Sequence, residues 1–288
     1  EYTDVPAGDI GVGTREIGWM FGQYKRITNR YESGTLTGKG LSWGGALVRP
    51  EATGYGAVFF LQEMLKVQGR DVEGRTCVVS GAGNVAIHAI EKLQQLGGRV
   101  LACSDSQGYV YDPDGIDLPT LRQVKEVERT TLQAYAGYRG GAVHHPRGNI
   151  WEVPTELALP CATQNELAAA DARMLVANGC LAVAEGANMP TTPEGLEVLR
   201  AGGVLFGPGK AANAGGVATS ALEMQQNAAR DSWTFAHTEA KLAEIMSSIH
   251  EQCAVTAEAY GRPGDYVLGA NVAGFVRVAD AMVALGLI

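Results

Sequence analysis

The stretch VVSGAGNVAIHAIEKLQQLGGRVLACSDSQG, residues 78–108, decides the fold of this chain. An apolar run ends at Ser80, and small residues follow at fixed spacing. Gly81 permits a tight turn, Gly83 lets the backbone approach a ligand, and Ala86 allows the next helix to pack closely on the strand. This order of strand, glycine turn and helix predicts the first half of a dinucleotide-binding unit.

The end of the same stretch bears on which dinucleotide is bound. Asn84 opens a helix whose free N–H groups and dipole favour a pyrophosphate. Asp105 follows about 20 positions later, where an acidic residue usually holds the ribose 2′-OH of NAD and repels a 2′-phosphate. Ser106 and its turn offer hydrogen-bond donors, whereas Lys125 and Arg129 fall on a predicted helix, where a solvated face is the favoured interpretation. These residues alone leave NAD and NADP open.

From residue 75 onward, short apolar runs alternate with helical stretches. Continuous apolar runs are what a parallel sheet buried on both faces requires. Strands that alternate with helices predict an α/β fold, here a doubly wound, Rossmann-like domain. The predicted strands lie in RTCVVS (75–80), GRVLAC (98–103), LALPC (157–161), CLAVAEG (180–186) and GVLFGPG (203–209).

Helices are predicted on either side of this pattern. Residues 15–31 carry apolar residues at helical spacing, and a second helix is expected after Arg49-Pro50-Glu51. Most of 214–260 is expected to be helical. Residues 271–285 predict a closing amphipathic helix with Val272, Phe275, Val276, Ala279, Met282 and Val283 on one face.

Composition narrows the classes of function. Of the 288 residues, 46% are hydrophobic and 19% charged, which indicates a globular chain able to bury a core. The net charge of −8, without a Lys/Arg cluster, argues against a nucleic-acid partner. No uninterrupted apolar run reaches the ~18 residues of a membrane span, so no membrane association is expected. Five scattered cysteines indicate a reducing, cytoplasmic compartment, and His144–His145 predicts a polar loop rather than a metal site.

Polar clusters follow the last three predicted strands, at 161–166, 184–190 and 208–220. Ligands of open α/β sheets bind at the carboxyl ends of the strands, so these clusters are candidates for a crevice beside the cofactor. Any one of these residues could instead serve only a turn or cap. Val217 and Ser220 share a helix face and could meet a substrate, although Ser220 could also bond only its own helix. The crevice candidates are Thr163, Gln164, Asn188, Lys210 and Asn213.

Seven stretches resemble, in order, the motifs of the hexameric glutamate dehydrogenases of the Glu/Leu/Phe/Val dehydrogenase superfamily. The wording is most similar to that of the bacterial NADP-linked branch. The stretches are DVPAGDIGVGTREIGWMFGQYKR, LTGKGLSWGGALVRPEATGYG, SGAGNVA, LPCATQNEL, AEGANMPTT, PGKAANAGGVATSALEMQQNAAR and GANVAGFVRVADAM.

The resemblance implies a division of the chain and a reaction. Residues 1–45 would be the last part of a substrate domain, 46–264 the cofactor domain, and 265–288 a helix that returns to the substrate domain. The implied reaction is the reversible, NADP-dependent oxidative deamination of L-glutamate to 2-oxoglutarate and ammonia by a homohexamer, with NAD a possible cofactor. The family's catalytic lysine is expected upstream of Glu1, so this chain alone is expected to lack it.

Two other functions stay open from the sequence. One is a catalytically incomplete module that binds the dinucleotide without turnover. The other is a related leucine-, phenylalanine- or valine-type dehydrogenase.

The resemblance also assigns site residues. Asp9 matches the catalytic acid/base, and Asp4 a structural neighbour. Basic residues of NADP-linked relatives fall where this chain has Glu128 and Thr131, a departure that puts the NADP preference in doubt. The implied cofactor positions are Thr53, Gly81, Gly83, Asn84, Val85, Asp105, Ser106, Ala162, Thr163, Asn188 and Asn213, and the implied substrate positions are Val217 and Ser220.

Overall fold

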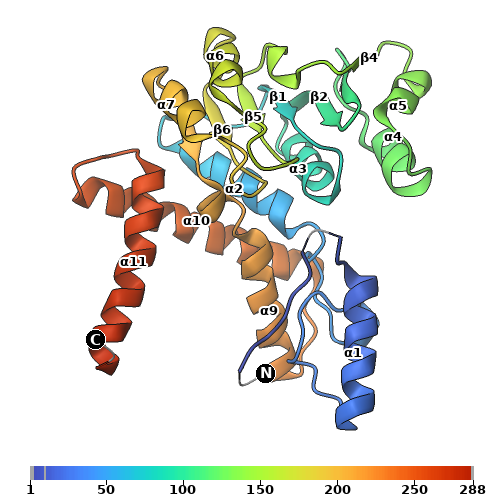
Figure 1. The fold of residues 1–288 in the computed structure, drawn as a ribbon, viewed down its shortest axis with the longest axis vertical. Coiled ribbons are helices and arrows are strands. Elements are labelled where there is room, and N and C mark those ends of the chain that lie inside the picture. Colours follow the sequence, from blue (N-terminus) through green and yellow to red (C-terminus); the bar gives the residue numbers. More distant parts are fainter. Residues whose placement is uncertain (1–2, 10, 287–288) are drawn as a thin grey trace.

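A seven-stranded sheet lies at the centre of the computed structural model, which describes residues 3–9 and 11–286 (Figure 1). The strand order is β4-β3-β2-β1-β5-β6-β7; the five strands from β2 to β7 are parallel, and β3 and β4 extend one edge in antiparallel pairing. This confirms the α/β prediction. The strands are β1 Thr76–Val79, β2 Arg99–Asp105, β3 Gly108–Tyr111, β4 Val143–Pro146, β5 Leu157–Leu159, β6 Ala182–Ala184 and β7 Leu205–Gly207.

Helices cover both faces of the sheet, as a doubly wound fold requires. Cys77 and Val79 of β1 join one apolar cluster with α2, α3 and α10, while Val78 joins a second cluster with α6 and α7. The helices are α1 Thr14–Thr28, α2 Ala52–Lys66, α3 Asn84–Gln95, α4 Leu118–Arg122, α5 Leu132–Tyr138, α6 Ala169–Ala177, α7 Pro193–Ala201, α8 Gly209–Ala212, α9 Gly215–Ala229, α10 Phe235–Ala259 and α11 Tyr266–Leu285, with short turns η1 Leu41–Trp43, η2 Gln123–Val127 and η3 Ile150–Glu152.

The antiparallel edge corrects one prediction. His144 and His145 lie in β4 rather than in a polar loop, and the His145 ring stacks on Tyr109 of β3 with centroids 4.6 Å apart. Strand β3 has only four residues, GYVY, and the edge strand β4, VHHP, is partly exposed and carries the two histidines. They therefore lack the continuous apolar run that marks the five parallel strands.

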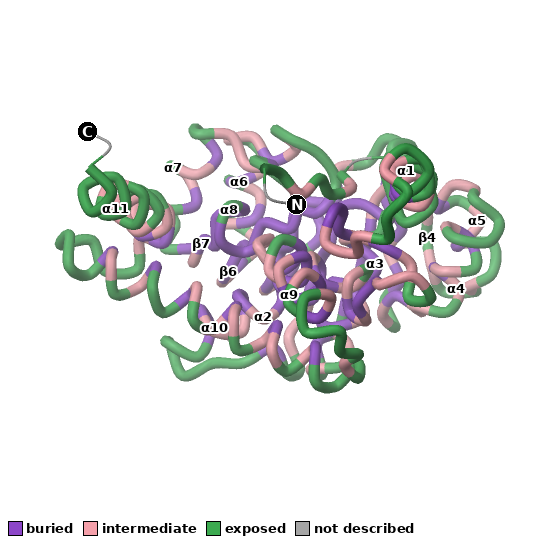
Figure 2. Tube along the Cα trace, turned by 90° about the horizontal axis from the view of Figure 1, so that it is seen from below, coloured by how far each residue is buried: buried purple, intermediate pink, exposed green. Residues whose placement is uncertain are grey.

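The last helix also differs from its prediction. Helix α11 begins at Tyr266, five residues earlier than predicted, and apolar side chains of its predicted face, such as Phe275 and Val283, are exposed (Figure 2). Among the described residues, α11 is the one helix long and apolar enough, by length and composition, to cross a membrane. The sequence analysis did not identify this helix as a possible membrane span, because Arg277 and Asp280 interrupt its apolar run.

Helices α2 and α9 touch backbone to backbone. A Cβ at Gly215 would lie 2.1 Å from the carbonyl oxygen of Ala52, and a Cβ at Gly56 would lie 2.8 Å from the Cα of Gly215. Only glycine at position 215 allows this approach, which sets α9 directly against the start of α2.

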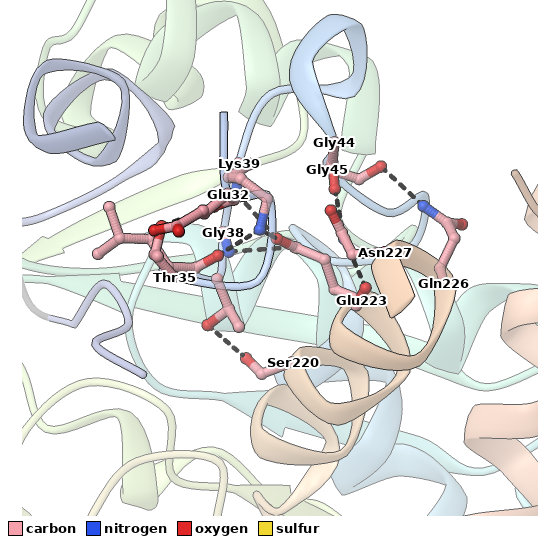
Figure 3. A network of polar contacts seen from close by, with 12 residues as sticks. Glu32, Thr35, Gly38, Lys39, Gly44, Gly45, Ser220, Glu223, Gln226 and Asn227 are labelled. Carbon is pink, nitrogen blue, oxygen red and sulfur yellow. Dashed lines mark hydrogen bonds and ion pairs between the residues drawn. The ribbon is translucent and has the colours of Figure 1, made fainter. Parts of the chain in front are cut away.

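A buried ion pair attaches the segment before α2 to α9 (Figure 3). The Lys39 ammonium lies 2.6 Å from a carboxylate oxygen of Glu223, and both side chains are fully buried. The same carboxylate accepts hydrogen bonds from the backbone N–H groups of Gly38 and Lys39, and the ammonium also donates to the Leu36 carbonyl. One turn further along α9, Gln226 and Asn227 donate side-chain N–H groups to the carbonyls of Gly45 and Gly44. Residues 36–45 are thus fixed to one face of α9.

Replacing Gly215 with alanine should destabilise the chain, because the new methyl group would collide with the Ala52 carbonyl. We expect the free energy of unfolding in urea to fall by about 1–3 kcal/mol, the usual cost of overpacking. The matched control is Gly137→Ala in α5, where a Cβ meets nothing within 4 Å; alanine there should leave stability unchanged or raise it by up to about 1 kcal/mol. Equal effects of the two substitutions would contradict the close α2–α9 contact.

Replacing Lys39 with methionine should leave the buried Glu223 carboxylate without its counter-ion. We expect a loss of about 3–5 kcal/mol in the free energy of unfolding. Lys39→Met/Glu223→Gln should recover at least about 1 kcal/mol of this loss, since the amide carries no charge. The control Lys66→Met removes half of the exposed Lys66–Glu63 pair and should cost less than about 1 kcal/mol. A cost as small for Lys39→Met would show that the pair is not buried.

Candidate active site

The glycine turn after β1 has the predicted geometry. Gly81 has a φ of +86°, which favours glycine, and its N–H donates to the Ser104 hydroxyl over 2.9 Å. A Cβ at Gly81 would lie 3.1 Å from the Cys161 carbonyl oxygen, so the turn abuts the end of β5. Gly83 precedes α3 without a side-chain cap, and a Cβ there would meet nothing within 4 Å. The first turn of α3 therefore presents free N–H groups to open space, as a pyrophosphate requires.

Two of the predicted crevice residues, Asn188 and Asn213, meet beyond the carboxyl ends of β6 and β7, whereas Lys210 bonds Asn271 of α11. The Asn213 side-chain amide donates to the Asn188 side-chain oxygen over 2.8 Å and reaches the Ala187 carbonyl at 3.3 Å. Ala162 and Thr163 are exposed beside the Gly81 turn. Asn84 lies at the start of α3 and donates to the Pro50 carbonyl, which joins the turn to the residues before α2.

Two carboxylates, the half-buried Glu166 and the buried Glu185, hold these loops in place, and the sequence analysis missed both. Glu166 accepts the Ser80 hydroxyl at 2.8 Å and the backbone N–H groups of Ala162 and Thr163 at 3.0 and 3.3 Å. Burial raises the pKa of Glu166, although these three hydrogen bonds oppose the rise. The sequence could have indicated this carboxylate, because Glu166 is the last residue of the polar cluster 161–166 that follows β5.

Glu185, which follows β6, likewise accepts backbone N–H groups of the neighbouring loops. Its two carboxylate oxygens accept the backbone N–H of Gly209 at 2.6 Å and of Thr191 at 3.1 Å, from the loops on either side. Burial raises the pKa of Glu185 as well. Glu166 and Glu185 thus accept backbone N–H groups of these loops, while the Asn213 amide bonds the Ala187 carbonyl and the Asn188 side chain.

The end of β2 corrects the interpretation of Lys125. Its ammonium does not lie on a solvated helix face but 3.2 Å from Asp105, and it extends from the π-helical turn η2. Asp105 also accepts the backbone N–H groups of Gln107 and Leu132, both at 2.9 Å. Burial raises the pKa of Asp105, but these hydrogen bonds and Lys125 outweigh that effect, so the pKa lies below its ordinary value. Arg129 is exposed, as predicted, but it lies beyond the end of η2, at a φ of +54°, rather than on a helix. Ser106 is exposed as well.

Thr37 connects the two predicted substrate-side elements. Its N–H donates to the Pro6 carbonyl at 3.1 Å, within the segment that carries Asp9, and its hydroxyl lies 3.3 Å from the Ser220 hydroxyl. Asp9 is exposed, and Ser220 is buried on the first turns of α9. Val217, one turn earlier, is 75% exposed. The structure thus links the segment of the predicted acid/base to the predicted substrate serine.

Arg49 is a further candidate that sequence reasoning missed. The residue is half-buried, and its Nε atom has no hydrogen-bond partner within the described part of the chain. One of its terminal nitrogens would lie 3.9 Å from a Cβ at Gly216, at the start of α9. Burial lowers the pKa of Arg49, against the opposing charge of Glu223. A half-buried cation with an unused donor, close to Gly216 at the start of α9, is suited to an anionic ligand.

Comparison with known proteins agrees with this geometry. Residues 44–286 match the family model described as Glutamate/Leucine/Phenylalanine/Valine dehydrogenase. The chain is 52% identical to an NADP-specific glutamate dehydrogenase of Helicobacter pylori over 99% of its own length and 65% of that protein. It is 53% identical to an NAD(P)-specific glutamate dehydrogenase of Xylanibacter ruminicola, over 99% and 64%.

A solved structure gives the same result. The crystal structure of Plasmodium falciparum glutamate dehydrogenase superposes with a TM-score of 0.96 at 47% identity, over 98% of this chain and 61% of that one. The chain therefore spans about 65% of the length of the curated relatives that it matches. The resemblance seen in the motifs is confirmed: the chain belongs to the Glutamate/Leucine/Phenylalanine/Valine dehydrogenase family.

Proposed function

We propose that this chain forms the cofactor-binding part and one wall of the substrate site of a glutamate dehydrogenase. The reaction is the reversible, NADP-dependent oxidative deamination of L-glutamate to 2-oxoglutarate and ammonia. The observation that carries this proposal is the Thr37 link, which joins the Asp9 segment to Ser220, in a chain whose α3 begins without a cap as dinucleotide-binding helices do. The names of relatives at 52–53% identity support it.

The residues present fit a dinucleotide. The free N–H groups of the first turn of α3, after Gly81 and Gly83, would hold the pyrophosphate. Asp105 and Ser106 lie at the ribose end, and a nicotinamide would lie at the opposite end. The nicotinamide, when bound, supplies the hydride chemistry. The residues proposed to surround it are Thr53, Val85, Ala162, Thr163, Asn188 and Asn213.

The substrate side supplies proton transfer and charge recognition. Asp9 is an exposed carboxylate that can take a proton from the carbinolamine hydroxyl and give one to the departing amine, and it can reverse both transfers in the reductive direction. The Ser220 hydroxyl can donate to a substrate carboxylate, and the half-buried Arg49 guanidinium can neutralise it. Val217, which is exposed on the same helix, would contact the substrate side chain.

The division of the chain and its assembly are part of the same proposal. Residues 1–45 and 265–288 would belong to a substrate domain, and 46–264 to the cofactor domain. Helices α1 and α11 lie on opposite sides of α9 in Figures 1 and 2, and each exposes large apolar side chains, such as Trp19 and Phe275. Such faces support a larger, homohexameric enzyme. The five buried, free cysteines support a cytoplasmic location.

The proposal is tested in a chimera in which residues 1–288 replace the matching part of the H. pylori enzyme. We expect Asp9→Asn to lower kcat at least ~100-fold while KM changes less than ~10-fold, because the amide binds but cannot exchange a proton at neutral pH. The control is Asp4→Asn, whose side-chain oxygen can still accept the Val5 N–H, and it should keep most of the activity.

Two results of this experiment would contradict the proposal. Loss of activity in Asp4→Asn but not in Asp9→Asn would reverse the roles of the two aspartates. A chimera that oxidised leucine or phenylalanine in preference to glutamate would replace the proposed substrate.

A further inference from the structure

The carboxylate at the end of β2 is already occupied by this chain's own groups. One oxygen of Asp105 accepts the Gln107 N–H at 2.9 Å, which closes the turn to Gly108. The other accepts the Leu132 N–H at 2.9 Å and the Lys125 ammonium at 3.2 Å. The Asp105 side chain is only 10% exposed. A carboxylate held in this way presents little uncompensated charge to a ligand.

Lys125 is itself held in position. Its ammonium donates to the Thr130 carbonyl at 2.8 Å as well as to Asp105, and its side chain is 20% exposed. An ammonium group has three N–H donors, so one is left for a further acceptor. The π-helical turn η2, at Gln123–Val127, carries this lysine to the end of β2.

Two other charged residues of this segment, Glu128 and Arg129, do not pair with Asp105. Arg129 is exposed, at a φ of +54°. The Glu128 carboxylate accepts from the Tyr138 hydroxyl at 2.8 Å and the Gln123 side chain at 3.1 Å. Lys125 is the cation that meets Asp105 within the described residues.

We propose that Lys125 determines cofactor specificity: by neutralising Asp105 and offering its third N–H, it lets the β2 end accept the 2′-phosphate of NADP. The inference rests on the proposed dinucleotide site and names the residue that selects between two cofactors there. Without Lys125, the Asp105 carboxylate would face a 2′-phosphate as a like charge and disfavour it. The same carboxylate would still accept a ribose 2′-OH, as in NAD-binding sites.

The test is calorimetric titration of the 288-residue chain with NADPH and NADH. Lys125→Met should weaken NADPH binding by about 30-fold or more and change NADH binding by less than ~3-fold. Lys125→Met/Asp105→Asn should regain at least ~10-fold in NADPH affinity, because the repelling charge is gone. The matched control, Arg129→Met, removes a charge from the same segment and should leave both affinities within ~3-fold.

The outcomes separate this inference from the proposed function. An unchanged ratio of NADPH to NADH affinity in Lys125→Met, or a loss confined to Arg129→Met, would overturn the inference and leave the dinucleotide site standing. A wild-type chain that bound neither dinucleotide would overturn the proposed function and the inference with it.

A second measurement does not depend on how the variants fold. The wild-type chain should bind adenosine 2′,5′-bisphosphate at least ~10-fold more tightly than adenosine 5′-monophosphate, because only the first carries the 2′-phosphate. Equal binding of the two nucleotides would also overturn the role of Lys125.

Discussion

The fully buried pair of Lys39 and Glu223 joins the two halves of the site. Removing two charges from water is costly, and the cost is offset only if the remaining donors and acceptors are satisfied. Here the Lys39 ammonium also donates to the Leu36 carbonyl, and the Glu223 carboxylate also accepts the backbone N–H groups of Gly38 and Lys39. The loop fixed in this way contains Thr37, the residue that touches both the Asp9 segment and Ser220. The position of the proposed acid/base relative to α9 therefore depends on an interaction that itself takes no part in the chemistry.

The cofactor edge follows a similar principle. Parallel strands bring their carboxyl ends together, but the loops beyond them contain backbone N–H groups that need acceptors. Glu166 and Glu185 accept those of Ala162, Thr163, Thr191 and Gly209. The close approach at Gly215 sets α9, which carries the proposed substrate residue Ser220, against the start of α2. Carboxylates that accept loop N–H groups, together with a glycine that permits helix contact, therefore fix the elements that carry the proposed site residues.

Much of this arrangement could be predicted from the sequence, and the failures have identifiable causes. The five parallel strands were found because burial on both faces demands apolar runs, and the glycine turn because its spacing is dictated by the pyrophosphate. Strand β3 was missed because it is only four residues long, and β4 because the partly solvated edge carries no apolar run. Lys125 was assigned to solvent because its pairing with Asp105 depends on a π-helical turn that periodicity does not signal. Arg49 was missed because its unused donor is a property of packing around the starts of α2 and α9.

The central claim is that this chain binds a dinucleotide along the carboxyl ends of its parallel strands. Hydrogen–deuterium exchange of the 288-residue chain, with and without saturating NADPH, tests it most directly. The account predicts slower exchange at the backbone amides of residues 81–86 and 105–107, and at the loops around 162–163 and 187–189, with little change in α6 and α7. Protection absent from residues 81–86, or centred on α6 and α7, would contradict it.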